Sequence, residues 1–117
     1  MRDRTFSAIL GGMNRGLPEM LLALERVTNL DSPSNEKKCV DRLANVLAEM
    51  WQECGCVCTI IPQKLHGNHL KVEWGSGDEQ LLVLCHMDTV WGKGETARRP
   101  FKIERAKAYG PVCNEDP

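Results

Sequence analysis

Residues 81–90 read LLVLCHMDTV, and this stretch decides how the rest of the chain is interpreted. Its first half, residues 81–85, is continuously apolar, which is typical of a strand covered on both faces in an α/β sheet. Its second half places His86 and Asp88 two residues apart, so on extended backbone both side chains point to the same side. Ligands bind beyond the carboxyl ends of strands in open α/β sheets. The stretch therefore predicts a central strand that presents a functional site at its end.

Two helices are predicted before this strand. Apolar residues at helical spacing around Pro18, which suits the first turn of a helix, predict a helix over residues 17–29. A second helix is predicted over residues 36–53, after a turn at residues 31–35 that offers several N-caps, and Gly55 ends it. Its apolar face consists of residues at steps of three and four: Val40, Leu43, Ala44, Leu47, Ala48 and Trp51.

Strands are predicted on both sides of the apolar stretch. Residues 56–61, CVCTII, are rich in β-branched and thiol side chains and predict a buried strand, and residues 69–74 predict another after a turn at Gly67-Asn68. Shorter strands are predicted at residues 101–103 and 108–109, about a turn at residues 105–107. Two helices followed by strands indicate an α/β fold, with the two N-terminal helices packed on a mixed sheet.

Composition restricts the possible partners and compartment. The chain has 117 residues and a net charge of −1, so it forms at most one domain and has no field that would attract nucleic acid or an anionic membrane. The apolar run at residues 6–10 is too short for a signal peptide or a membrane span. We therefore expect a cytoplasmic protein without nucleic-acid or membrane partners, whose six cysteines are reduced thiols.

The His86–Asp88 pair has two interpretations from its residues alone. A carboxylate that accepts the second ring N–H of a histidine fixes its tautomer and makes it a better metal ligand. Alternatively, His86 is an ordinary histidine at a strand end and Asp88 caps the next turn. The spacing leaves both interpretations open.

Further motifs occur along the chain in a recognisable order. They are Asp31-Ser32-Pro33-Ser34, Gly67-Asn68-His69-Leu70, the run from Leu82 to Val90, Pro100-Phe101 and Tyr109-Gly110-Pro111. Together they resemble the opening of the zinc-dependent exopeptidase family that includes glutamate carboxypeptidase (carboxypeptidase G), acetylornithine deacetylase and succinyl-diaminopimelate desuccinylase. The resemblance covers residues 17–111 and implies that they are the N-terminal portion of a metallopeptidase catalytic domain, preceded by a flexible extension at residues 1–16.

The resemblance also implies a chemistry and a role for each residue of the pair. His86 corresponds to a zinc ligand and Asp88 to the catalytic aspartate beside it. Members of the family use two zinc ions to hydrolyse a peptide or amide bond in a small peptide or N-acyl amino acid, releasing an amino acid. They often form dimers through a domain that has no counterpart here.

The resemblance fails after Pro111, and residues 112–117 form a divergent tail. Asn114 stands where the family has the aspartate that bridges the two zinc ions, and a neutral amide cannot supply that charge. Asp116 is a weak substitute. Because a zinc site needs about three or four protein ligands, the sequence predicts an N-terminal fragment that binds zinc poorly and is inactive alone.

Two alternatives to a hydrolase fragment remain from the residues. One is a non-catalytic α/β remnant or binding module. The other is a cysteine-based metal-binding module at Cys54, Cys56 and Cys58, although Cys56 and Cys58 are better explained as small apolar residues on one strand face. A basic cluster at residues 93–99 could guide an anionic substrate, but a solvated loop explains it as well.

Overall fold

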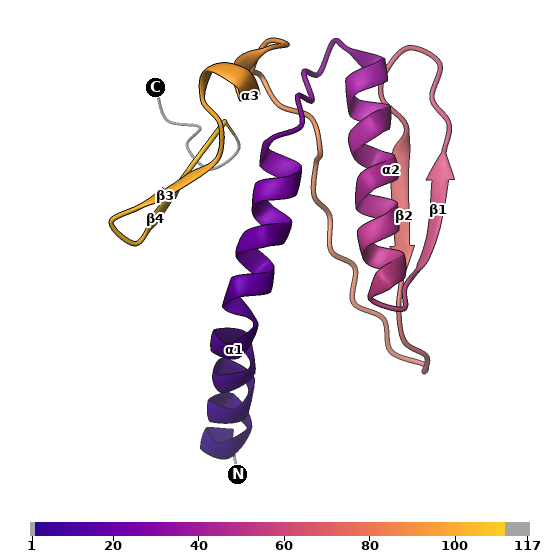
Figure 1. Cartoon of the computed structure of the whole chain (residues 1–117). Helices are drawn as coiled ribbons and strands as arrows, with labels where there is room; N and C mark the ends of the chain where they lie inside the picture. Colours follow the sequence, from indigo (N-terminus) through magenta and orange to yellow (C-terminus); the bar gives the residue numbers. More distant parts are fainter. Residues whose placement is uncertain (1, 112–117) are drawn as a thin grey trace.

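The computed structural model describes residues 2–111 and shows an α/β arrangement of helices and short antiparallel strand pairs (Figure 1). The elements in chain order are α1 (Arg2–Thr28), α2 (Lys37–Glu53), β1 (Val57–Ile61), β2 (His69–Glu73), α3 (Glu95–Arg98), β3 (Lys102–Glu104) and β4 (Lys107–Tyr109). No helix within residues 2–111 is both long enough and apolar enough to cross a membrane.

Helix α1 is longer than the sequence predicted. It begins at Arg2 rather than at residue 17. Most of the predicted extension at residues 1–16 is therefore helical and continuous with the predicted helix. That this extension is flexible stays a prediction. Pro18 lies inside the helix instead of in its first turn. Glycine weakens a helix interior by about 1 kcal/mol, yet α1 continues through the glycines at residues 11, 12 and 16.

Helix α2 confirms the predicted element and its end. Glu36 is its N-cap residue and makes no side-chain capping bond, so the predicted capping by residues 31–35 is wrong. At the other end Cys56 N–H donates to Trp51 O at 3.1 Å and Gly55 N–H to Gln52 O at 2.9 Å. With Gly55 at a φ of 82°, these bonds form a Schellman motif, as expected of a glycine after a helix.

The small core lies between α2 and the antiparallel β1–β2 hairpin (Figure 1). The buried apolar residues are Val40, Leu43, Ala44 and Ala48, all on α2. Trp51, predicted on the same face, is 47% exposed. Strand β1 is covered on one face only, since Val57 and Ile61 are exposed. The predicted buried strand is therefore half-buried, because nothing within the described residues covers its second face.

The connection between β1 and β2 is held against α2 by two adjacent residues. A Cβ atom on Gly67 would lie 2.2 Å from Val40 Cγ1, so only glycine allows this approach. Asn68 N–H donates to Asp41 Oδ1 at 2.7 Å, and Asn68 Oδ1 accepts from Gln63 N–H at 2.9 Å. The Gly67-Asn68 turn thus has a packing function as well as a conformational one.

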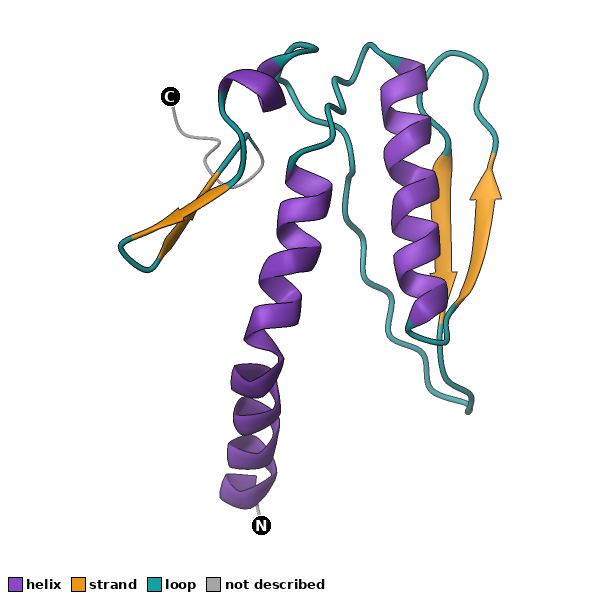
Figure 2. Ribbon diagram, in the orientation of Figure 1, coloured by secondary structure: helices purple, strands orange, loops and turns teal. Residues whose placement is uncertain are grey.

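Residues 81–85 do not form the predicted central strand. They run as a loop between α1 and α2 (Figure 2), and residues 81–84 are 72% to 91% exposed. A strand requires a hydrogen-bonded neighbour, and no segment within residues 2–111 pairs with this one. Residues 81–85 are apolar, as a buried strand requires, but an apolar composition does not determine whether another strand lies beside them.

The last hairpin agrees with the prediction within a residue. Strand β3 pairs with β4, and Arg105 and Ala106 connect them with φ values of 50° and 60°. Positive φ at both central residues is typical of a type I′ turn, which matches the twist of a two-residue hairpin. The turn that was predicted at residues 105–107 therefore occupies residues 105–106.

Candidate functional site

The loop that carries the His86–Asp88 pair is fixed to the segment after α1. Thr89 forms a parallel bridge with Pro33. Thr89 N–H donates to Ser32 O at 2.8 Å, and Thr89 O accepts from Ser34 N–H at 3.0 Å and from Ser34 Oγ at 3.0 Å. Two motifs that lie more than fifty residues apart in the sequence therefore meet here.

His86 and Asp88 are in contact, although they are not at the end of a strand. His86 Nδ1 lies 2.8 Å from the backbone oxygen of Asp88 and 3.4 Å from its Oδ1. A carbonyl oxygen only accepts hydrogen bonds, so Nδ1 is the donor in this contact, and in the neutral ring Nε2 is the atom with the free lone pair. The His86 side chain is 74% exposed. This geometry leaves Nε2 accessible to a metal ion.

The Asp88 carboxylate is held in its charged form. The hydroxyl of Ser34 is the largest cause of a lowered pKa of Asp88, and burial opposes it more weakly. The nearby His86 lowers this pKa further. The sequence analysis predicted Ser34 only as one of several possible N-caps and did not predict its contact with Asp88.

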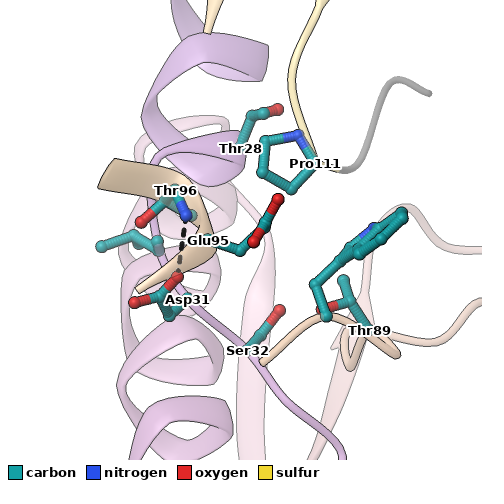
Figure 3. Close-up of a pocket in the computed structure, with 9 residues that line it drawn as sticks. Thr28, Asp31, Ser32, Thr89, Glu95, Thr96 and Pro111 are labelled. Atoms are coloured by element: carbon teal, nitrogen blue, oxygen red, sulfur yellow. Dashed lines mark hydrogen bonds between the residues drawn. The ribbon is translucent and has the colours of Figure 1, made fainter. Parts of the chain in front are cut away.

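A shallow hollow adjoins this anchored loop (Figure 3). Its lining residues are Thr28, Leu30, Asp31, Ser32, Thr89, Trp91, Glu95, Thr96 and Pro111. The carboxylate of Asp31 accepts from Gly94 N–H at 2.8 Å and from Thr96 N–H at 3.1 Å. Burial alone would raise the pKa of Asp31, but these two backbone bonds and Thr96 Oγ1 outweigh it, so the pKa is lowered. Asp31 thereby joins the end of α1 to α3.

The Tyr-Gly-Pro motif closes one side of the hollow. Gly110 is buried, and a Cβ atom there would lie 2.4 Å from Thr28 Cγ2 at the end of α1. Pro111 is also buried and lines the hollow (Figure 3). Glycine in this motif is therefore explained by close packing.

The two arginines of the basic cluster pair with neighbouring side chains. Arg98 Nη1 lies 3.0 Å from Glu95 Oε2, and Arg99 also pairs with Glu95. The Arg99 guanidinium lies 4.1 Å from the centre of the Trp91 ring. These contacts explain Arg98 and Arg99 as structural partners of α3 and of Trp91.

The described residues do not complete a metal site. Within residues 2–111 no group of three or more His, Cys, Asp or Glu side chains is arranged to hold a metal ion. His86 and Asp88 alone are fewer than the roughly three or four protein ligands that a zinc site needs. The residues discussed as a departure from the family, Asn114 and Asp116, lie outside the described part of the chain.

The thiol cluster is better suited to packing than to metal binding. Cys54 is exposed, whereas Cys56 and Cys58 are half-buried, and Cys58 Sγ lies 3.5 Å from Ala48 O. Burial raises the pKa of Cys56, and Cys54 and Cys58 raise it further. A metal binds the thiolate, so a raised pKa weakens this site as a ligand set.

Comparison with known proteins adds one finding about ancestry. The chain is similar to carboxypeptidase G2. This relative, from Pseudomonas sp. (strain RS-16), is 29% identical over 106 residues, which are 85% of this chain and 25% of the relative. The chain thus spans about a quarter of the length of this relative. No protein-family model matches the chain. The similarity supports a carboxypeptidase-like, and hence hydrolase, relationship.

Proposed function

We propose that this chain contributes the His86–Asp88 pair to a zinc-dependent exopeptidase or amidohydrolase. The reaction is hydrolysis of a peptide or amide bond in a small peptide or N-acyl amino acid, with release of an amino acid. The observation that carries the proposal is the contact of His86 Nδ1 with Asp88, which leaves an exposed Nε2. The similarity to carboxypeptidase G2 supports the same reaction class.

Asp88 has a positioning role in this proposal. Its backbone oxygen accepts the Nδ1 proton, and its carboxylate lies 3.4 Å from the same nitrogen. Both contacts favour the tautomer in which Nε2 is the free donor atom, and a carboxylate beside the ring raises its basicity. Ser34 keeps that carboxylate ionised.

The described residues do not form a complete zinc site. A single histidine with a nearby carboxylate is below the ligand number that zinc requires. We therefore expect the isolated chain to hold zinc weakly and to hydrolyse no peptide or N-acyl amino acid.

Elemental analysis of the purified chain tests this proposal. After dialysis against a low zinc concentration, we expect less than one zinc ion per chain, a further loss in His86→Ala and no change in the matched variant His66→Ala. A full equivalent of zinc that disappears in Cys56→Ala would contradict the proposal and favour a thiol site.

A chimera tests the hydrolase assignment directly. In it, residues 17–111 replace the matching segment of carboxypeptidase G2, and release of amino acids from short peptides and N-acyl amino acids is measured. We expect hydrolysis, and a loss of kcat/KM of about 100-fold or more in His86→Ala, since removing even an outer partner of a metal ligand costs 10–100-fold. A folded chimera whose hydrolysis is unaffected by His86→Ala would refute the role of His86.

A further inference from the structure

Helix α1 presents an apolar stripe that the rest of the described chain leaves uncovered. The stripe consists of Phe6, Ile9, Leu10, Met13, Leu17 and Met20. Each of these side chains is between 47% and 69% exposed. This half of α1 extends away from α2 and the hairpins (Figure 1). Further along the helix, Leu24 and Val27 are half-buried.

The spacing of the stripe is that of a helix pairing surface. Phe6, Leu10, Met13, Leu17 and Met20 follow one another at alternating steps of four and three residues. This repeat averages 3.5 residues and occupies the a and d positions of a heptad, the pattern that brings one helix against another. The same repeat continues through Leu24 and Val27, which are half-buried, so only its part in residues 6–20 is left uncovered.

We propose that α1 pairs with α1 of a second copy of this chain, in antiparallel orientation about Met13. In this register the numbers of two opposite residues add up to 26, so Phe6 lies opposite Met20 and Ile9 opposite Leu17, and large apolar side chains meet. The rest of each chain, with α2 and the hairpins, follows the carboxyl end of α1. The two copies of this part then lie at opposite ends of the helix pair. A parallel pair would place both bodies side by side at one end.

Charge is compatible with this register. Arg4, Arg15 and Glu19 lie at outward-facing positions of the heptad, so no charged side chain of residues 4–20 lies between the two helices. In an antiparallel pair the positive end of each helix dipole lies beside the negative end of the other, which is favourable.

The size of the stripe is sufficient for a reversible dimer. A large apolar side chain that is half exposed presents on the order of 100 Å², so six of them give roughly 600 Å² per copy and roughly 1,200 Å² in total. This total is at the lower limit of specific interfaces. We therefore expect a weak dimer that dissociates on dilution.

Sedimentation velocity over a concentration series tests the proposal. We expect a monomer that converts to a dimer as concentration rises, and a shift of the midpoint of at least tenfold in Leu10→Glu. Leu22→Glu is the matched control, because Leu22 is 66% exposed but lies off the stripe, and it should leave the midpoint unchanged. Circular dichroism checks that both variants remain helical.

One cysteine added to the stripe then tests the orientation, with the unmodified chain and its six native cysteines as the reference. Under mild oxidation Met13→Cys should give more covalent dimer than the unmodified chain, because the two added thiols lie opposite each other. Phe6→Cys should not, because Phe6 lies opposite Met20 of the second copy and far from Phe6 of that copy. A chain that stays monomeric at all concentrations, or that responds equally to Leu10→Glu and Leu22→Glu, would overturn the proposal. Cosedimentation of a monomeric chain with phosphatidylglycerol vesicles would overturn it in favour of a membrane surface.

Discussion

Asp41 illustrates how a single side chain ties the described core together. Its carboxylate accepts from Lys37 Nζ at 2.8 Å and from Asn68 N–H at 2.7 Å, and Lys37 Nζ also donates to Asn68 Oδ1 at 2.8 Å. The Lys37 bond is the largest cause of the lowered pKa of Asp41, followed by the Asn68 bond. The sequence placed Asp41 on α2 and Asn68 in a turn, but it could not show that they meet, because their contact depends on how the hairpin packs.

We predict that Asp41→Asn lowers the free energy of unfolding at pH 7 by about 1 kcal/mol, the typical value of a hydrogen bond. The folded-state pKa lies below the unfolded value of 3.8, so this stabilisation is complete above pH 3.8 and is lost as pH falls through the folded-state pKa. Urea unfolding at pH 7 and at low pH checks this. The exposed Asp78→Asn is the control, and an equal effect of the two variants at pH 7 would contradict the prediction.

Gly67→Ala should destabilise the fold by about 1–3 kcal/mol, the usual cost of overpacking a core. The reason is the 2.2 Å separation between a Cβ at Gly67 and Val40 Cγ1. Thermal unfolding followed by circular dichroism measures the effect. Gly92→Ala, where a Cβ would meet nothing within 4 Å, should change stability little. If the two variants unfolded alike, the close approach of Gly67 would be excluded.

At the scale of elements, local signals were predictable and non-local ones were not. The apolar period of α2, its terminal Gly55 and the turn of the last hairpin are all encoded within a few residues, and the structure confirms them. The start of α1 was missed because Pro18 was interpreted as a first-turn proline, whereas it lies inside the helix. The segment at residues 81–85 was missed because strand formation depends on a partner, which its own composition does not specify.

The β3–β4 turn should become more stable in Ala106→Gly. Ala106 has a φ of 60°, a region that costs a residue with a Cβ atom about 1–2 kcal/mol and glycine almost nothing. We expect slower amide hydrogen exchange across β3 and β4. Ala108→Gly, within strand β4, should speed that exchange. A turn variant that exchanges faster than the unmodified chain would show that the positive φ values are not adopted in solution.

At the scale of the whole molecule, the described chain is extended and has a small core. Its radius of gyration is 16.4 Å, compared with roughly 13 Å for a compact domain of this length. The four buried apolar residues of α2 form the core, while residues 81–84 and one stripe of α1 remain exposed. The α/β class and the pairing of His86 with Asp88 were predictable from the sequence. The support from Ser34 and the hollow beside it were not, because they depend on contacts across more than fifty residues.

Long-range nitrogen-15 NMR of the histidine rings, recorded during a zinc titration, tests the central claim most directly. Our account predicts that His86 carries its proton on Nδ1 before zinc is added. It also predicts that His86 Nε2 responds at a lower zinc concentration than the rings of His66 and His69. A proton on Nε2 of His86, or a response at His66 and His69 before His86, would contradict the account.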